Sequence, residues 1–305
     1  MTKERIPPTF KSSPTKASPA PSKTKKSKPS KKSKSKGRRI QKLVMAGVWC
    51  VALILAMTAW FTYDMPSLNR LMTVGRKPSI TFLAQDGQRI LTMGDYYGQP
   101  VDAAKLPAHV KNAFLAIEDR RFYSHWGVDV LGLVRAAWRN YKAGGVVQGG
   151  STITQQLAKN FLTTQGLFQH NNRSLRRKVQ EVLLAFWLEH RLSKDQILTL
   201  YLNRVYFGTG AYGLNAAAHL YFNRQASDLN IFEAAILAGL MKAPSKYSPF
   251  VDQELSLGRG RQVLIAMGEA HYIKTAHLTN LSAPRFMNRM HLGSGFARYF
   301  TDWVY

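Results

Sequence analysis

The stretch GGSTITQQLAKNFL, residues 149–162, joins a glycine-rich loop to the start of a helix. Thr152, followed three residues later by Gln155, has the pattern of a capping box, in which each side chain accepts a hydrogen bond from the other residue's backbone N–H. A glycine loop that opens a capped helix presents free backbone N–H groups, which suit phosphate oxygens. Because the stretch lacks the Gly-Lys-Ser/Thr ending of a nucleotide-binding loop, only the milder prediction of a phosphate-facing helix N-terminus is kept.

Helical patterns continue on both sides of this stretch. Apolar spacing and capping residues predict helices from 106 onward, over 130–141, over 174–192, from 193 to 208, over 231–242 and over roughly 253–270. Ser193 with Gln196, and Asn230 with Glu233, are placed to cap the helices that begin after them. Further upstream, SITFLAQDGQRIL (79–91) has two β-prone runs around an Asp-Gly turn, which predicts a hairpin. The predicted fold is therefore mainly α, with a small β element before the helices.

An uncharged apolar run precedes the predicted domain. LVMAGVWCVALILAMTAWFTY, residues 43–63, is as long as a transmembrane helix requires. A cleaved signal peptide is the alternative, but its apolar core is shorter, about 7–15 residues, and is followed by a small-residue cleavage site rather than by bulky aromatics. We therefore predict a retained single-pass anchor.

The segment before the apolar run is strongly basic. Residues 1–42 hold 15 lysines and arginines against the single acid Glu4, in a chain of net charge +26. The positive-inside rule places this segment in the cytoplasm and everything after the span on the outer side. Its Lys/Ser/Pro-rich composition predicts disorder. We interpret it as a topology signal that contacts anionic lipid loosely, rather than as a nucleic-acid-binding tail.

Two acids are the best candidates for chemistry. Glu118 follows an apolar run, and partial burial would raise the pKa of its carboxyl and let it act as a base near neutral pH. A solvated acid at a helix end is the equally open alternative. Glu181 stands four residues after Arg177, so a simple ion pair along one helix is the more economical interpretation.

Several other kinds of site are excluded or disfavoured. A single cysteine, Cys50, allows neither an intramolecular disulfide nor a cysteine zinc cluster. His125 has no partner at metal-ligand spacing, so no metal site is predicted. The chain has no Gly-x-Ser-x-Gly nucleophile elbow.

Five motifs together carry a specific resemblance. They are EDRRFYSHWG (118–127), GGSTITQQLAKN (149–160), RKVQE (177–181), KDQILTLYLNRVYFG (194–208) and LAGLMKAPSKYSP (237–249). In this order they resemble the peptidoglycan glycosyltransferases of family 51, the domain found in class A penicillin-binding proteins. The resemblance covers roughly 78–270 and implies a lysozyme-like helical fold with a lobe that dips into the membrane. The apolar residues of FLTTQGLF (161–168) fit such a lobe, and an ordinary buried loop is the alternative.

The resemblance also implies a reaction. The 4-hydroxyl of an acceptor attacks the anomeric carbon of a lipid-linked donor, undecaprenyl pyrophosphate leaves, and the sugar inverts. Glu118 occupies the position of the general base, and Glu181 that of a second glutamate, which assists at the pyrophosphate. No cofactor is required on this resemblance, although a divalent cation, Mg²⁺ or Mn²⁺, can sit at the pyrophosphate.

The resemblance further implies which residues contact the substrate. The matching positions hold Asp119, Ser151, Thr152, Gln156, Lys159, Arg177, Lys178 and Lys242. The lysines and Arg177 suit phosphate, whereas Asp119, Thr152 and Gln156 are expected to line the cleft. Phe122 and His125 are expected to pack and orient the first motif rather than to react.

The chain departs from the family pattern in three places. Thr199 stands where the fourth motif commonly has glutamate, and TTQGLFQHNN (163–172) is longer than usual. After the membrane span there is neither a Ser-x-x-Lys nor a Lys-Thr-Gly motif of a transpeptidase, yet FARYFTDWVY (296–305) resembles the start of the linker toward one.

The expected organisation follows from these observations. We predict a disordered basic cytoplasmic tail (1–42), a transmembrane helix (43–63), a linker with a small β element (64–105), a glycosyltransferase domain (106–272) and the start of a linker toward a transpeptidase domain that this chain lacks (273–305).

The expected function is polymerisation of lipid II into β-1,4 glycan strands at the bacterial inner membrane. The expected partners are lipid II, the growing glycan strand, inner-membrane lipids and other proteins of cell-wall synthesis, but no nucleic acid. A non-catalytic lipid II binder and a lysozyme-like glycan-cleaving enzyme are the alternatives. The second and third motifs disfavour cleavage, because that reaction needs no cluster of cations for pyrophosphate.

Overall fold

The computed structural model describes residues 32–63, 79–83, 85, 89–145, 149–164, 166, 174–274 and 281–287. The predictions for the start of the basic tail, for the glycine loop around 146–148, for most of 163–172 and for 296–305 lie outside these residues. The N-terminal unit, up to Thr58, and the rest of the chain are two separate compact units.

One long helix, α1, runs from Lys32 to Thr62, and all of it but its last residues belongs to the N-terminal unit. Its stretch Gly37–Trp60 is long and apolar enough to cross a membrane, judged by length and composition. The helix begins well before the apolar run that opens at Leu43, so the prediction of disorder up to residue 42 is wrong for 32–42. Extending an existing helix avoids the cost of nucleation, and lysine, arginine and glutamine are good helix formers.

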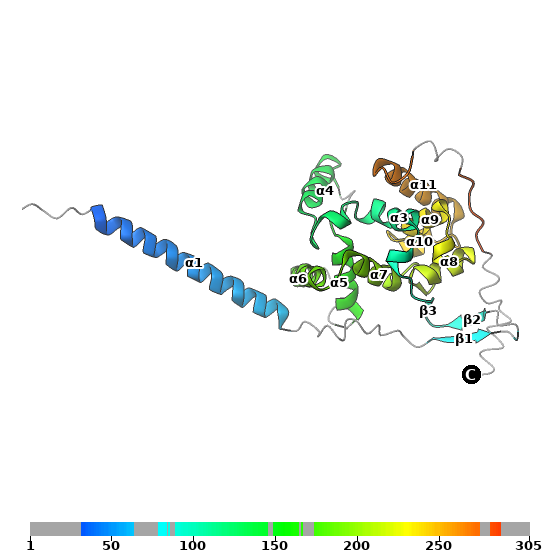
Figure 1. Cartoon of the computed structure of the whole chain (residues 1–305), viewed down its shortest axis with the longest axis horizontal. Coiled ribbons are helices and arrows are strands. Elements are labelled where there is room, and N and C mark those ends of the chain that lie inside the picture. The colour runs from blue at the N-terminus through cyan, green and yellow to red at the C-terminus, as the bar shows by residue number, and fades with distance from the viewer. Residues whose placement is uncertain are drawn as a thin grey trace, which may run out of the picture. The chain divides into compact units, whose positions relative to one another are not determined.

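The second unit is mainly helical, as predicted (Figure 1). Its α-helices are α3 (Ala108–Glu118), α4 (Val130–Lys142), α5 (Ile153–Thr164), α6 (Leu175–Arg191), α7 (Lys194–Arg204), α8 (Leu214–Phe222), α9 (Ile231–Leu240), α10 (Pro244–Tyr247) and α11 (Gln253–Glu269). The described residues also form three short 3₁₀ helices, η1 (Ala103–Lys105), η2 (Phe122–Ser124) and η3 (Ala226–Asp228).

Strands are short and stand before or between the helices. They are β1 (Ile80–Leu83), β2 (Arg89–Met93), β3 (Tyr96–Tyr97) and β4 (Ala211–Tyr212). Strands β1 and β2 pair antiparallel, with Ile80 opposite Met93, which confirms the predicted hairpin. Strand β3 pairs in parallel with β4, so part of the segment predicted as a linker is built into the helical unit.

Capping residues place the helix starts, as the sequence indicates. Ser193 with Gln196, and Asn230 with Glu233, form the predicted reciprocal capping boxes at α7 and α9. At α5 the Thr152 N–H donates to the Gln155 side chain at 3.3 Å, and the Gln155 N–H donates to Thr152 Oγ1 at 3.2 Å. All three capping boxes are therefore confirmed.

Three helices differ from the prediction, since the four-residue α10 was also not predicted. Helix α7 ends at Arg204 rather than at 208, because the chain becomes extended at Val205 and Tyr206 then bridges to Tyr212. Helix α8 was not predicted. Its sequence, LNAAAHLYF, is apolar on nearly all sides, so it shows no amphipathic stripe, and most of it is buried.

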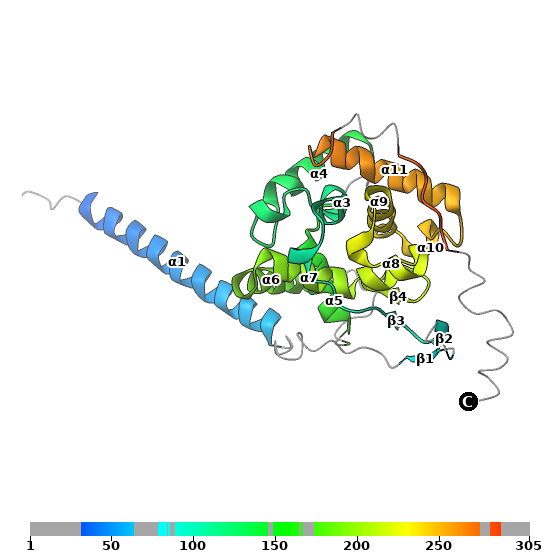
Figure 2. The ribbon, with the colours of Figure 1, turned by 45° about the vertical axis from the view of Figure 1, so that its right-hand side comes forward.

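Helix α9 forms the centre of the core (Figure 2), where it contacts α3, α8, α10 and α11. Every residue of α9 after Ile231 is buried, as expected for a helix that is apolar all round. Helix α11 comes close to α9 at Gly260, where an added Cβ would lie 2.6 Å from Ile236 Cγ1 and 3.0 Å from the Phe232 ring. This close approach fixes the position of α11 beside the C-terminal end of α3.

Candidate active site

A cleft of about 650 Å³ opens where α3, α4, α5 and α11 converge. Its polar and charged lining residues are Glu118, Asp119, Arg120, Asp129, Arg135, Arg139, Ser151, Thr152, Gln156, Lys242 and Arg259. Six of the ten residues that the sequence proposed for the site are among them, drawn from segments far apart in the chain. The cleft is therefore the candidate active site.

Glu118 is the last residue of α3 and lines the cleft. It keeps part of its surface open, yet it is enclosed enough by protein for burial to raise the pKa of its carboxyl above the ordinary value of 4.5. A hydrogen bond from Gln156 Nε2 to Glu118 Oε2, 2.8 Å long, and the charge of Arg259 offset part of this rise. A carboxyl with a raised pKa is suited to accept a proton near neutral pH.

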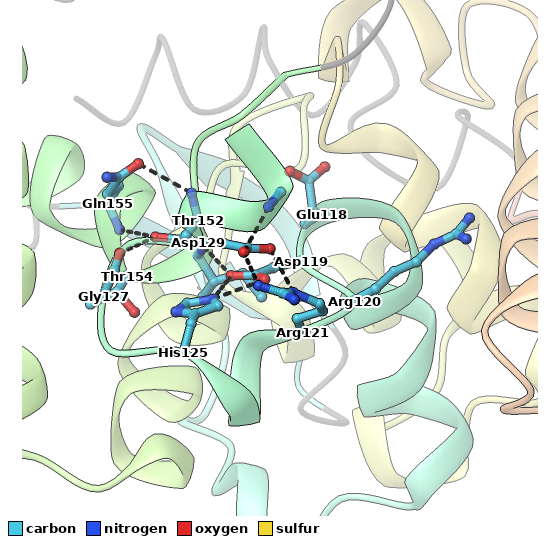
Figure 3. A network of polar contacts seen from close by, with 12 residues as sticks. Glu118, Asp119, Arg120, Arg121, His125, Gly127, Asp129, Thr152, Thr154 and Gln155 are labelled. Atoms are coloured by element: carbon cyan, nitrogen blue, oxygen red, sulfur yellow. Dashed lines mark hydrogen bonds and ion pairs between the residues drawn. The ribbon is translucent and has the colours of Figure 1, made fainter. Parts of the chain in front are cut away.

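Asp119 is held by structure on two sides (Figure 3). Its carboxylate accepts the backbone N–H of Ile153, the first residue of α5, at 3.1 Å. It also contacts His125 Nε2 at 2.9 Å, and both side chains are buried. Asp119 thus lines the cleft and at the same time ties the end of α3 to the N-terminus of α5. Phe122 and His125 are buried, in agreement with the packing role expected of them.

A second buried network holds the first motif against α5, and the sequence did not identify it. Glu189, at the end of α6, accepts hydrogen bonds from Thr154 Oγ1 at 2.6 Å and from Lys194 Nζ at 2.7 Å. The same Lys194 ammonium donates to the backbone oxygen of His125 at 2.6 Å. Thr152 Oγ1 donates to the backbone oxygen of Gly127, also at 2.6 Å.

Helix α4 is joined to the first motif through its N-cap. Asp129 accepts the backbone N–H of Gly132 at 2.8 Å and forms an ion pair with Arg121. Because Arg121 follows Glu118 by only three residues, the position of α4 is coupled to that of the candidate base.

Glu181 lies outside the cleft lining, in an ion-pair group on α6. Arg177 Nε is 3.0 Å from Glu181 Oε1, and Lys178 Nζ is 3.2 Å from Glu181 Oε2. The predicted ion pair between Arg177 and Glu181 is confirmed. Lys178 also donates to Ser151 Oγ at 2.9 Å, and Ser151 lines the cleft. The group therefore meets the cleft at its edge.

Some of the remaining predicted residues line the cleft and others do not. Thr152 and Gln156 line the cleft from α5, and exposed Lys242 lines it from the segment after α9. Lys159, half-buried on α5, is not among the described lining residues. Thr199 has a structural contact, since its hydroxyl accepts the backbone N–H of Ala103 at 2.8 Å.

Four cleft arginines were not singled out from the sequence. Arg135 and Arg139, four residues apart on α4, face the cleft from one side, and Arg259 of α11 faces it from another. Arg120, beside Asp119, completes the set. The spacing of Arg135 and Arg139 was a readable signal of a shared helix face. Arg259 had no such signal in the sequence, because only the packing of α11 on α9 brings it near Glu118.

Exposed apolar residues gather on α4. The exposed ones are Val130, Leu131, Leu133, Val134, Trp138 and Tyr141. For 161–168 the sequence left open a membrane-dipping lobe and a buried segment. Phe161 and Leu162 are fully buried on the inner face of α5, so burial is the correct interpretation for these two residues. The last residues of that stretch, 167–168, lie outside the described part.

The donor groups present do not fit a divalent cation held by the protein alone. Within the described residues there is no group of three or more histidine, cysteine or acidic side chains that could hold a metal ion. The neighbours of Glu181 are Arg177 and Lys178, whose positive charges oppose a cation there. We therefore derive no step of a reaction through a metal.

The chain is similar to known proteins over most of its helical unit. The family model described as transglycosylase matches residues 86–268. The chain is 51% identical over 173 residues to penicillin-binding protein 1A of Aquifex aeolicus, covering 57% of this chain and 23% of the relative. It is 44% identical over 227 residues to penicillin-binding protein 1A of Neisseria flavescens, covering 74% of this chain and 27% of the relative.

Two further matches come from other bacteria. Penicillin-binding protein 1F of Bacillus subtilis is 43% identical over 189 residues, covering 62% of this chain and 26% of the relative. The crystal structure of penicillin-binding protein 1A from Haemophilus influenzae matches with a TM-score of 0.41 at 21% identity, covering 76% of this chain and 24% of that structure's chain. The chain spans about a quarter of the length of the curated relatives that it matches. On the match over 86–268, which includes the whole cleft, the chain belongs to the transglycosylase family.

Proposed function

We propose that this protein is a peptidoglycan glycosyltransferase, which polymerises lipid II into β-1,4 glycan strands and releases undecaprenyl pyrophosphate. The observation that carries the proposal is a carboxyl with a raised pKa, Glu118, in a cleft lined by Arg135, Arg259 and Lys242. Such a cleft combines a base for a hydroxyl group with positive charge for a phosphorylated leaving group.

The proposed reaction is one displacement at the anomeric carbon of the donor. Glu118 accepts the proton of the acceptor's 4-hydroxyl as the hydroxyl oxygen forms the new glycosidic bond. The bond from the anomeric carbon to the pyrophosphate oxygen breaks, and that oxygen leaves with the electron pair. Attack from the face opposite the leaving group inverts the sugar from α to β. The proton on Glu118 then passes to solvent through the open side of the cleft.

Positive side chains stabilise the charge that develops on the pyrophosphate. Lys178 reaches the cleft edge through its contact with Ser151, and Lys242 lies on the cleft wall. Glu181 contributes indirectly in this proposal, because it holds Lys178 and Arg177 in fixed positions. The first-turn N–H groups of Ile153 and Gln155 are already bound by Asp119 and Thr152, so α5 contributes only its helix dipole beside Ser151.

We further propose that the protein acts at the outer face of the bacterial inner membrane, where its lipid-linked substrate is found. Helix α1 supplies the anchor, with the basic N-terminal segment in the cytoplasm. The exposed apolar side chains of α4, next to the cleft arginines Arg135 and Arg139, support contact with the bilayer surface. Lipid II, the growing glycan strand and inner-membrane lipids are the proposed partners.

Incubation of the full chain with lipid II in detergent micelles tests the proposal, with glycan products separated by gel electrophoresis. We expect polymer from the wild type and none from Glu118→Gln. The matched control is Glu254→Gln, an exposed acid in the first turn of α11, which is expected to keep full activity. Release of muropeptides from intact sacculi without any polymer would instead support glycan cleavage, and binding of lipid II without polymer from the wild type would support a non-catalytic binder.

A further inference from the structure

Three side chains from three helices form a hydrogen-bonded line that ends at Glu118. Tyr201 of α7 is 1% exposed, and its hydroxyl donates to Gln156 Oε1 of α5 at 3.1 Å. The other end of the same amide, Gln156 Nε2, donates to Glu118 Oε2 at 2.8 Å. The line therefore runs from a fully buried phenol, through one amide group, to the carboxyl at the cleft wall.

The chemistry of the three groups allows only one direction of donation along this chain of hydrogen bonds. An ionised carboxylate only accepts hydrogen bonds, so the Gln156 amide must turn its NH₂ group toward Glu118. Its carbonyl oxygen then faces Tyr201, and the Tyr201 hydroxyl must be the donor. Rotation of the amide by half a turn would place the carbonyl oxygen against the carboxylate, where two acceptors repel each other.

We infer that Tyr201 is a positioning residue, whose hydroxyl fixes the amide orientation of Gln156 and thereby holds Glu118 ready to accept a proton. The importance of this role for catalysis rests on the proposed function, whereas the orientation itself does not. Tyr201 is not itself among the described residues that line the cleft, and it contacts the lining residue Gln156, so its effect on the reaction passes through Gln156.

The electrostatic surroundings agree with these assignments. Burial, together with the charges of Glu118 and Asp119, raises the pKa of Tyr201 well above 10, so the phenol keeps the proton that it donates. For Glu118, burial raises the pKa and the Gln156 hydrogen bond lowers it. Loss of a correctly oriented amide is therefore expected to raise the pKa of Glu118 further.

Other charged groups face Glu118 from the elements around it. They are Asp119, which follows Glu118 at the end of α3, Arg259 of α11, Arg135 and Arg139 of α4, Asp129 at the N-cap of α4, Lys242 after α9, and Arg120. A change from Tyr201 to phenylalanine leaves all of them in place, so a shift in the pKa of Glu118 in this variant reports on the amide.

The direct test measures the pKa of Glu118 without any need for activity. The full chain in detergent micelles is labelled with ¹³C at glutamate carboxyls, and the Glu118 signal is identified by its disappearance in Glu118→Gln. We expect Tyr201→Phe to raise the pKa of Glu118. The matched control is Tyr221→Phe, which also removes a buried phenol but one that donates to the backbone oxygen of Phe207 at 3.0 Å, away from the cleft. That control is expected to leave the pKa of Glu118 unchanged.

Kinetics on lipid II supplies the second readout. Loss of one orienting hydrogen bond is expected to lower kcat roughly five- to tenfold with little change in KM, and to move the acidic limb of the pH profile to higher pH. Gln156→Leu is expected to lower kcat at least as much. Because Tyr201 acts through Gln156, adding Tyr201→Phe to Gln156→Leu should cause no further loss of kcat.

Two results would overturn the inference. One is a pKa of Glu118 in Tyr201→Phe that equals the wild-type value or moves only as far as in Tyr221→Phe. The other is a double variant in which the losses of Tyr201→Phe and Gln156→Leu multiply, because the two residues would then act independently. A wild type that makes no polymer would contradict the proposed function while leaving the pKa test valid.

Discussion

Arg177 Nε lies 3.0 Å from Glu181 Oε1, and both groups are buried on the same face of α6. The guanidinium N–H is not aligned for a hydrogen bond to that oxygen, so the contact is an ion pair. Lys178 binds the other carboxylate oxygen and reaches Ser151 at the cleft. The ion pair on α6 and a role in the candidate site are thus compatible, because the carboxylate that neutralises the two cations also holds them in place.

Removing the charge of Glu181 tests this view. In Glu181→Gln we expect kcat to fall by about 10²-fold, the size typical for loss of a preorganised electrostatic group, because Lys178 and Arg177 lose the carboxylate that orients them. The affinity for lipid II should change less, since the two positive charges remain. Steady-state kinetics on lipid II measures both quantities. A rise in KM with an unchanged kcat would show instead that the group serves binding alone.

The pKa of Glu118 also predicts a stability effect. Burial raises the pKa of Glu118 in the folded state above the unfolded value near 4.5, so ionisation of Glu118 destabilises the folded protein. This destabilisation begins above the unfolded pKa and reaches its full size above the folded pKa. Glu118→Gln is therefore expected to raise the melting temperature at pH 7 while abolishing polymerisation. At a pH below 4.5 the difference should vanish, because the carboxyl is protonated in both states. Thermal melts of both proteins across this range, followed by circular dichroism, measure the effect; a destabilised variant at pH 7 would contradict it.

The approach of α11 to α9 predicts a sharp contrast between two glycines on one helix. Gly260→Ala places a Cβ 2.6 Å from Ile236 Cγ1 and is expected to lower the free energy of unfolding by about 1–3 kcal/mol. Gly258→Ala meets no atom within 4 Å and is expected to stabilise α11 by up to about 1 kcal/mol. Urea unfolding of the two variants gives the comparison. Equal effects would mean that the contact at Gly260 does not limit the packing of α11.

The buried pair of Lys194 and Glu189 predicts a larger loss. Lys194→Met leaves the Glu189 carboxylate, whose side chain is 3% exposed, without its cation, and should lower the free energy of unfolding by about 3–5 kcal/mol. The control is Lys105→Met at an exposed pair with Asp102, where the change should stay within about 1 kcal/mol. If both variants unfold at the same denaturant concentration, Lys194 does not hold the first motif in place.

Local sequence patterns predicted much of the secondary structure. The capping pairs at Thr152, Ser193 and Asn230 each placed the start of a helix correctly, because a cap involves only residues three positions apart. The same local logic failed for α8, whose sequence is apolar on nearly all sides and therefore has no period. It also left Phe161 and Leu162 undecided, because an apolar pair looks the same in sequence whether it faces lipid or the core.

The candidate site divides in the same way. Ordered motifs identified Glu118, Asp119, Thr152 and Gln156, all of which line one cleft. The spacing of Arg135 and Arg139 shows only that they share a helix face. The approach of Arg259 to Glu118 and the contact of Tyr201 with Gln156 depend on how α11 and α7 pack, so no local pattern reveals them.

The sequence by itself determined the helical class, most helix starts and an apolar segment long enough to span a membrane, and its ordered motifs pointed to Glu118 as the acid that we propose as the base. Only the tertiary structure decided that Glu118 has a raised pKa and that Glu181 lies apart from it in an ion-pair group. The reason is physical: capping and helix formation depend on neighbours within a few residues, whereas desolvation and charge at Glu118 depend on atoms from α5 and α11, such as Gln156 and Arg259, which are distant in the chain.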